Sequence, residues 1–285
     1  MKKTIMIGLF LTGLSVFQYV WADDHQAAKL TRLWEAKGFI TPESVLPVPE
    51  KGIMYVSNIG SQNPTAKEGT GFISILNDKG EIKELKWSSG LNSPKGMAIV
   101  GQKLYVTEVD RISAIDLNTG KKIKEYPVPE ATFLNDIAAD DQGRLYISAS
   151  RSGTVYKLAE GIVSVFIKSE DYGNVNGVVI EQNKLVVGTG SKIIKVDLES
   201  KEVTDFMTNT GAVDGIAFVK SDMVVFSDWP GKIHIMKAGK EKELILDTSE
   251  IETLQTADFG YNGDKKLIYV PTFFGNTVVC YQLEL

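Results

Sequence analysis

Cysteine and histidine are almost absent from this chain of 285 residues, which contains one cysteine and two histidines. The lone Cys280 cannot form an internal disulfide, and its apolar surroundings in the sequence predict a small buried core residue. His25 lies near the N-terminus and His234 in a predicted strand. A Ser–His–Asp triad or a histidine-based zinc site therefore lacks the necessary residues.

The chain also lacks a basic cluster and has a single long apolar run. Its formal net charge is −5, so neither nucleic acid nor an anionic membrane is an expected partner. The apolar run, residues 4–20, follows two lysines and ends in small residues, which predicts a secretory signal peptide of residues 1–22, cut before Asp23. An uncleaved membrane anchor is the alternative, although the run is short for a span. The residue directly after the cleavage site is Asp23 and not a cysteine, which argues against a lipoprotein, and we expect export to the periplasm or the cell exterior.

No convincing helical pattern is present, but a pattern of short strands recurs six times. Residues 213–218, 223–227 and 232–236 read as three strands joined by tight turns. Equivalent positions of the six repeats fall at residues 43, 95, 135, 176, 214 and 257. Their spacing is close to the ~40–45 residues of a propeller blade. The sequence therefore predicts an all-β fold, a six-bladed β-propeller of four-stranded antiparallel blades that forms one domain over residues 23–285.

The sixth repeat supplies only three strands before the chain ends. We expect residues 29–36 to add the outermost strand to this last blade and so to close the ring. Polar, alternating runs provide the fourth strands of the other blades, at residues 81–87, 121–128, 161–168, 201–207 and 240–247. Their charges predict a solvated outer edge.

The start of each innermost strand can turn a side chain into the central channel. The residues at these six ring positions are Glu43, Lys95, Asn135, Asn176, Asp214 and Ala257. Loops after the second strands lie at the same end of the channel and bring Asn58, Glu108, Asp110, Asp228 and Trp229 near its mouth. Trp229 is expected either in the wall of a pocket or in core packing. The long loop of residues 58–70 is either a flap over the mouth or a solvated insertion.

Two carboxylates and two amide oxygens around one axis suit a hard cation such as calcium, which takes six to eight oxygen ligands. Without a cation, Glu43 and Asp214 repel each other and one pKa rises. The alternative is a polar ring that solvates a water-filled channel and holds the blades together.

Residues 42–45, 134–136, 175–177 and 213–215 resemble the spaced motifs of the gluconolactonase and regucalcin (senescence marker protein) family. The resemblance extends over nearly the whole chain after residue 22. It implies a six-bladed propeller with one divalent metal, whose ligands map onto Glu43, Asn176 and Asp214, and a substrate-contacting Asn135. It also implies hydrolysis of sugar lactones, other lactones or phosphoesters.

The mechanism that the resemblance implies is metal-assisted ester hydrolysis, in which Asp214 is both a ligand and the general base. Calcium is the favoured cation, with zinc, magnesium and manganese as alternatives. The expected partner is a small molecule at the channel mouth, and we expect a monomer.

Two positions depart from the family pattern. Phe133 stands where the family has a sugar-binding arginine, so a polyhydroxylated lactone fits poorly. Lys95 could neutralise Glu43 and Asp214 as a buried ion pair, bind an anionic group of the substrate, or point to solvent. Two further interpretations share the architecture: a non-catalytic module that binds a small ligand or a protein, as NHL-type repeats do, and a propeller of the strictosidine-synthase-like kind.

Overall fold

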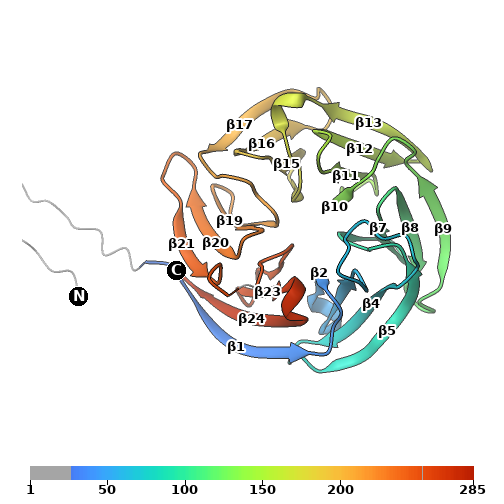
Figure 1. Ribbon diagram of the computed structural model, residues 1–285. Helices are drawn as coiled ribbons and strands as arrows, with labels where there is room; N and C mark the ends of the chain where they lie inside the picture. The colour runs from blue at the N-terminus through green and yellow to red at the C-terminus, as the bar shows by residue number, and fades with distance from the viewer. Residues whose placement is uncertain (1–26, 252) are drawn as a thin grey trace, which may run out of the picture.

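The computed structural model describes residues 27–251 and 253–285, which form a ring of six four-stranded antiparallel sheets (Figure 1). The predicted all-β, six-bladed propeller is confirmed. The predicted signal peptide, residues 1–22, and His25 lie outside the described residues. The helices in the described part of the chain are the short 3-10 turns η1 Pro49–Lys51, η2 Glu170–Tyr172 and η3 Phe273–Gly275. None of them is long and apolar enough to cross a membrane.

Each blade begins with its innermost strand at the channel and runs outward. In the first three blades the strands are β2 Pro42–Val48, β3 Ile53–Asn58, β4 Gly71–Asn77 and β5 Ile82–Leu91; β6 Met97–Val100, β7 Lys103–Thr107, β8 Arg111–Asp116 and β9 Lys122–Pro127; and β10 Leu134–Ala139, β11 Leu145–Ala149, β12 Thr154–Ala159 and β13 Ile162–Lys168. In the last three they are β14 Val178–Glu181, β15 Lys184–Gly188, β16 Lys192–Asp197 and β17 Val203–Thr208; β18 Ile216–Lys220, β19 Met223–Asp228, β20 Lys232–Lys237 and β21 Glu243–Asp247; and β22 Gly260–Asn262, β23 Leu267–Pro271, β24 Thr277–Glu284 and β1 Lys29–Lys37.

The last blade takes its outer strand from the start of the chain, as predicted for residues 29–36. Strand β1 pairs antiparallel with β24, with Lys29 opposite Glu284 (Figure 1). Trp34 of β1 reaches inward, and its ring centroid lies 5.9 Å from that of Tyr269. The same indole lies against Gly80 of the first blade, where a Cβ would come within 2.6 Å of the ring. Strand β1 therefore contacts both blades at the closure of the ring.

The hydrophobic core lies between neighbouring blades. Tyr55 and Leu91 of the first blade, for example, pack with Met97 and Leu104 of the second. The second strands are apolar because both of their faces are covered, and β11 is buried along its whole length. The charged fourth strands of the first five blades are largely exposed, as predicted for a solvated outer edge. Cys280 is fully buried, which confirms the predicted core residue, and burial raises the pKa of its thiol to about 12.

The predicted strand 213–218 is wrong in its bounds, because β18 is Ile216–Lys220. In two other blades the ladder is irregular at the ring position: its register shifts across Glu43 in the first blade and across Asn135 in the third. Such bulges break the alternation of side chains and re-aim a residue out of the sheet. Here they allow the ring residues to face the channel.

Candidate functional site

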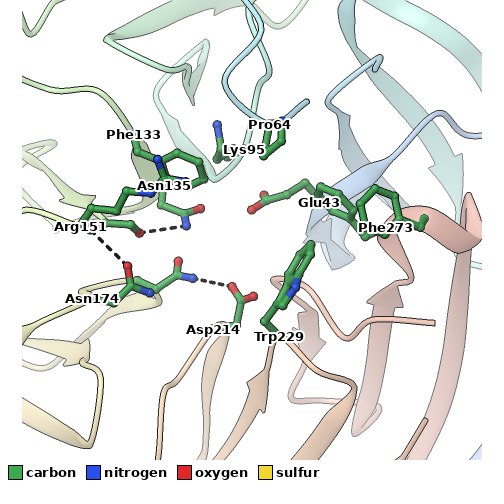
Figure 2. A pocket seen from close by; sticks show the side chains of 13 residues that line it. Glu43, Pro64, Lys95, Phe133, Asn135, Arg151, Asn174, Asp214, Trp229 and Phe273 are labelled. Atoms are coloured by element: carbon green, nitrogen blue, oxygen red, sulfur yellow. Dashed lines mark hydrogen bonds between the residues drawn. The ribbon is translucent and has the colours of Figure 1, made fainter. Parts of the chain in front are cut away.

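The polar ring residues gather around one cavity of about 290 Å³ at the channel mouth (Figure 2). The sequence-predicted residues that line it are Glu43, Lys95, Phe133, Asn135, Asn176, Asp214 and Trp229. Ala257, the sixth ring position, is different: it is fully buried and packs against Ile59 and Phe273. The cavity is therefore polar on the sides of five blades, and the sixth blade contributes apolar packing.

Asn176 and Asp214 come from neighbouring blades and touch. The amide nitrogen of Asn176 donates a hydrogen bond of 2.8 Å to Oδ1 of Asp214 (Figure 2). Gly177 makes this approach possible, because a Cβ at this position would lie 2.2 Å from the carbonyl oxygen of Asp214. The glycine that follows Asn176 in the sequence thus sets the distance between two site residues.

Two buried oxygens of the ring, Oε2 of Glu43 and Oδ1 of Asn176, have no hydrogen-bond partner among the residues that the structure describes. Buried acceptors without a partner are rare and costly, and each needs a physical explanation. No three side chains of His, Cys, Asp or Glu gather into a metal-binding group within the part of the chain that the structure describes. A cation here would depend on the amide oxygen of Asn176 together with the carboxylates of Glu43 and Asp214. An oxygen-only set of this kind fits calcium.

Both carboxyl groups of this set hold their protons more tightly than usual. Burial, and then the neighbouring Asp214 and Asp258, raise the pKa of Glu43 well above its ordinary value, while Lys95 opposes the shift. Burial and Asp258 raise the pKa of Asp214 to about 8, against the hydrogen bond from Asn176. The repulsion expected from the sequence is present, but burial is the larger cause of both shifts.

Two more buried carboxylates lie directly behind the ring, and sequence reasoning missed both. Asp258 accepts a hydrogen bond of 2.5 Å from the hydroxyl of Ser44, and burial raises its pKa to about 6. Asp136 accepts bonds of 2.7 Å from the backbone N–H groups of Ile137 and Val178. Ser44 and Val178 belong to the next blade in each case, so these carboxylates tie neighbouring blades together. The sequence feature that could have identified them is their position, since each follows a ring residue directly, Asp136 after Asn135 and Asp258 after Ala257.

Lys95 forms no ion pair with a described carboxylate and does not point to solvent, which were two of the three alternatives considered from the sequence. It is fully buried, and its Nζ donates to the carbonyl oxygen of Ser93 at 3.0 Å and lies 4.6 Å from the centroid of the Phe133 ring. Burial lowers the pKa of Lys95 to about 8, and Glu43 and Glu108 limit the shift. The guanidinium carbon of Arg151 lies 4.5 Å from the centroid of the same Phe133 ring. Two cationic side chains thus share one wall of the cavity.

The opposite wall is aromatic. Trp229, Phe273 and Phe274 contact one another edge to face, with the ring centroids of Trp229 and Phe273 4.6 Å apart. All three line the cavity, and Trp229 is 42% exposed. The mouth therefore offers an apolar surface facing the cationic one (Figure 2).

Four loop residues expected near the mouth do not line the cavity but hold loops in place. Asn58 is buried and its Oδ1 accepts from the backbone N–H of Ile40. Asp110 pairs with Lys67 and Arg111. The remaining two accept backbone hydrogen bonds of nearby turns, Glu108 from Asn92 and Asp228 from Lys232.

The sequence analysis did not predict six of the residues that line the cavity. Most of them stand at positions equivalent to those of predicted residues. They are Pro64, Ser150, Arg151, Asn174, Phe273 and Phe274. Ser150 and Arg151 follow the second strand of their blade, as do Phe273 and Phe274, and Asn174 precedes its ring position by two residues, as Phe133 does. Pro64 comes from the long loop 58–70, which is tied down where the hydroxyl of Ser93 donates to Ala66. This loop is therefore part of the cavity wall.

The comparisons with known proteins support the architecture. No protein family matches the sequence, and no curated protein matches it. Among solved structures, a catalytically inactive histidine-to-alanine variant of virginiamycin B lyase from Staphylococcus aureus, with quinupristin bound, has a TM-score of 0.62 at 18% identity, over 90% of this chain and 100% of that one. A streptogramin B lyase has a TM-score of 0.63 at 14% identity, over 90% and 98%. A provisionally assigned gluconolactonase has a TM-score of 0.64 at 16% identity, over 90% and 92%. At these identities the likeness shows the six-bladed fold alone.

Proposed function

We propose that this protein hydrolyses a lactone or a related ester with the help of one divalent cation, calcium being favoured, held by Glu43, Asn176 and Asp214. The observation that carries the proposal is the pair of buried oxygens without partners, Oε2 of Glu43 and Oδ1 of Asn176, beside Asp214. Protein interiors rarely leave acceptors unpaired, whereas metal ligands need free lone pairs. A cation at this place would polarise the ester carbonyl and make a neighbouring water more acidic.

Asp214 is the residue that takes the proton from the attacking water. Its carboxyl group is buried in the wall of the cavity, beside the place proposed for the cation and the attacking water. The amide of Asn176 fixes the orientation of this carboxyl group through the 2.8 Å hydrogen bond. Once deprotonated, Asp214 is held ready to accept a proton at its free oxygen.

The other lining residues position the substrate. Asn135 donates its amide N–H to Ser150 at 3.1 Å, so the orientation of its side chain is fixed at the cavity wall. Trp229 presents an exposed aromatic face to an apolar part of the substrate. Lys95 and Phe133 form the wall opposite Trp229 (Figure 2).

The lyase neighbours suggest a different chemistry on the same fold. In one of them a histidine-to-alanine variant is catalytically inactive. In the described part of this chain no histidine lines the cavity: His234 lies on β20, stacked on Phe226 and 3.8 Å from Asp228. The residues at the mouth therefore favour hydrolysis assisted by carboxylates over a lyase reaction that needs a histidine.

The test is elemental analysis of protein purified without chelators, followed by a panel of lactones and esters assayed with and without EDTA. We expect one equivalent of bound divalent metal and a hydrolysis rate that EDTA abolishes and calcium restores. Turnover that is insensitive to EDTA contradicts the role of the cation. Tight binding of panel members with no turnover in the metal-loaded protein contradicts the hydrolase and leaves a binding module.

A further inference from the structure

Two cationic side chains converge on one aromatic ring inside the cavity. Nζ of Lys95 and the guanidinium carbon of Arg151 lie 4.6 Å and 4.5 Å from the centroid of Phe133. All three residues line the same cavity, and Phe133 and Arg151 lie across it from Trp229 and Phe273 (Figure 2). We refer to Lys95, Phe133 and Arg151 as the cationic corner.

The cationic corner has N–H donors that form no hydrogen bond with a described residue. An ammonium group has three N–H donors, and Lys95 uses one of them, on the carbonyl oxygen of Ser93. The guanidinium of Arg151 makes no hydrogen bond or ion pair with another residue that the structure describes; its backbone N–H alone is bonded, to Oδ1 of Asn174. Lys95 and Arg151 thus place two like charges near one ring, and both keep N–H donors that no described residue accepts from.

The backbone at Arg151 is held in an unusual conformation. Its φ of 74° lies in the left-handed region, which costs energy for a residue other than glycine. The bond of 3.2 Å from its N–H to Asn174 of the next blade anchors this turn after β11. The surroundings therefore fix the point from which the Arg151 side chain enters the cavity.

We propose that the cationic corner binds an anionic group of the substrate, so that the protein acts on a lactone or ester that also carries a carboxylate or a phosphate. The proposal rests on the hydrolase function above, since the anion lies in the same cavity as Glu43 and Asp214. Arginine and lysine together are the usual partners of carboxylates and phosphates, with arginine giving a bidentate contact. The aromatic wall opposite takes the apolar part of the same molecule.

This assignment also gives Phe133 a role. The guanidinium of Arg151, which follows β11, rests on the ring of Phe133, which precedes β10. Stacking on an aromatic ring stabilises a cation that forms no ion pair with a described carboxylate.

Binding tests the corner without any need for turnover. Benzoate, phenyl phosphate and the uncharged benzamide are titrated into the protein in the presence of EDTA, which removes any contribution of a bound cation, and binding is measured by calorimetry. We expect benzoate or phenyl phosphate to bind at least about tenfold more tightly than benzamide, and more weakly at high salt. The tighter of the two anions tells whether the corner prefers a carboxylate or a phosphate. Equal affinity for all three probes overturns the proposal.

Substitutions at the cationic corner test whether the anion binds there. Arg151→Gln, at an exposed position, is expected to lose about tenfold in affinity for the anions and none for benzamide. The matched control is Arg32→Gln, which removes one exposed positive charge from β1, outside the cavity, and is expected to bind like the parent. Lys95→Met should resemble Arg151→Gln, but the site is fully buried, so the arginine variant decides. Identical affinities of Arg151→Gln and Arg32→Gln overturn the proposal.

Turnover separates this proposal from the hydrolase function. A lactone that bears a carboxylate is compared with its neutral amide; we expect kcat/KM to favour the acid by about tenfold, and Arg151→Gln to remove the preference through KM. Equal turnover of both lactones overturns the anion site alone. Anion binding that depends on Arg151, with no lactone or ester hydrolysed by the metal-loaded protein, supports the corner and refutes the hydrolase.

Discussion

Asp214 combines two properties that rarely occur together in one carboxyl group. It is buried, so its pKa rises to about 8, and it touches a neighbouring ring residue, Asn176, which holds it in place. A surface aspartate has neither property. The fixed orientation is the physical reason to assign the base to Asp214 rather than to Glu43, whose carboxyl oxygens accept no hydrogen bond from another described residue.

The first prediction concerns Asp214→Asn, which keeps the volume of the side chain and removes the carboxylate. Hydrolysis of a susceptible lactone is expected to fall by at least about 100-fold, the usual contribution of a general base. The new amide oxygen still accepts from Asn176, so the Tm measured by calorimetry should stay the same or rise. Asp222→Asn, at the exposed pair with Lys237, is the control and should keep full activity. A folded Asp214→Asn protein with parental turnover contradicts the role of Asp214.

At the scale of the blades, the glycines after the ring positions control how closely neighbouring sheets approach. Gly177 shows this most clearly, because a Cβ there would lie 2.2 Å from a backbone oxygen of the next blade. Backbone cannot move aside as the end of a long side chain can. At three ring positions, Lys95, Asn176 and Asp214, a glycine follows the polar residue, so these positions serve both the cavity and the packing.

Gly177→Ala should therefore push the fourth and fifth blades apart and separate Asn176 from Asp214. We expect lactone hydrolysis to fall about tenfold or more, with a lower Tm, since misplacement of a reacting group by about 1 Å is costly. Gly190→Ala is the matched control: its nearest neighbour would be 3.7 Å away, in an ordinary backbone conformation. Equal activity and Tm for the two alanine variants would mean that the close approach is not required.

The pairing of β1 with β24 predicts that the whole strand β1 contributes to the stability of the ring. A chain that begins at Thr41 loses the ladder to β24 and the contacts of Trp34 with Tyr269 and Gly80. Its Tm should fall by about 10 °C or more, at about 2–4 °C per kcal/mol for a chain of this size. The exposed edge of β24 should also favour association, visible in gel filtration. A chain that begins at Lys29 serves as the control, and equal Tm values for the two chains contradict the closure.

For the molecule as a whole, the sequence repeat made the ring residues predictable. The contacts between loops could not be predicted from it. Glu43, Asn176 and Asp214 could be assigned to one axis because each occupies the same place in a blade. Arg151 follows the second strand of its blade, so its place at the mouth could be predicted by the same rule. Its approach to Phe133 could not, because it depends on a left-handed turn and on Asn174 of the next blade. Contacts of this kind are set by the relation between blades, which a single repeat does not contain.

The same radial arrangement makes the whole ring sensitive to pH, because it brings buried carboxyl groups together on its axis. Asp258 has a pKa of about 6 and Asp214 of about 8 in the folded, metal-free chain, against 3.8 when unfolded. A raised folded pKa means that the folded state binds more protons, so stability falls as pH rises from about 4 to about 8. Surface carboxylates with lowered pKa, such as Asp197 at about 2, are almost fully ionised in both states above about pH 5.5 and add little slope there. In EDTA, the Tm should therefore be lower at pH 8 than at pH 5.5.

Calcium should raise the Tm more at pH 8 than at pH 5.5, because ligands must lose their protons to bind it. Calorimetry at both pH values checks this, with Asp214→Asn expected to flatten the slope between pH 6 and 8. A Tm that rises with pH in EDTA would contradict the buried carboxyl cluster.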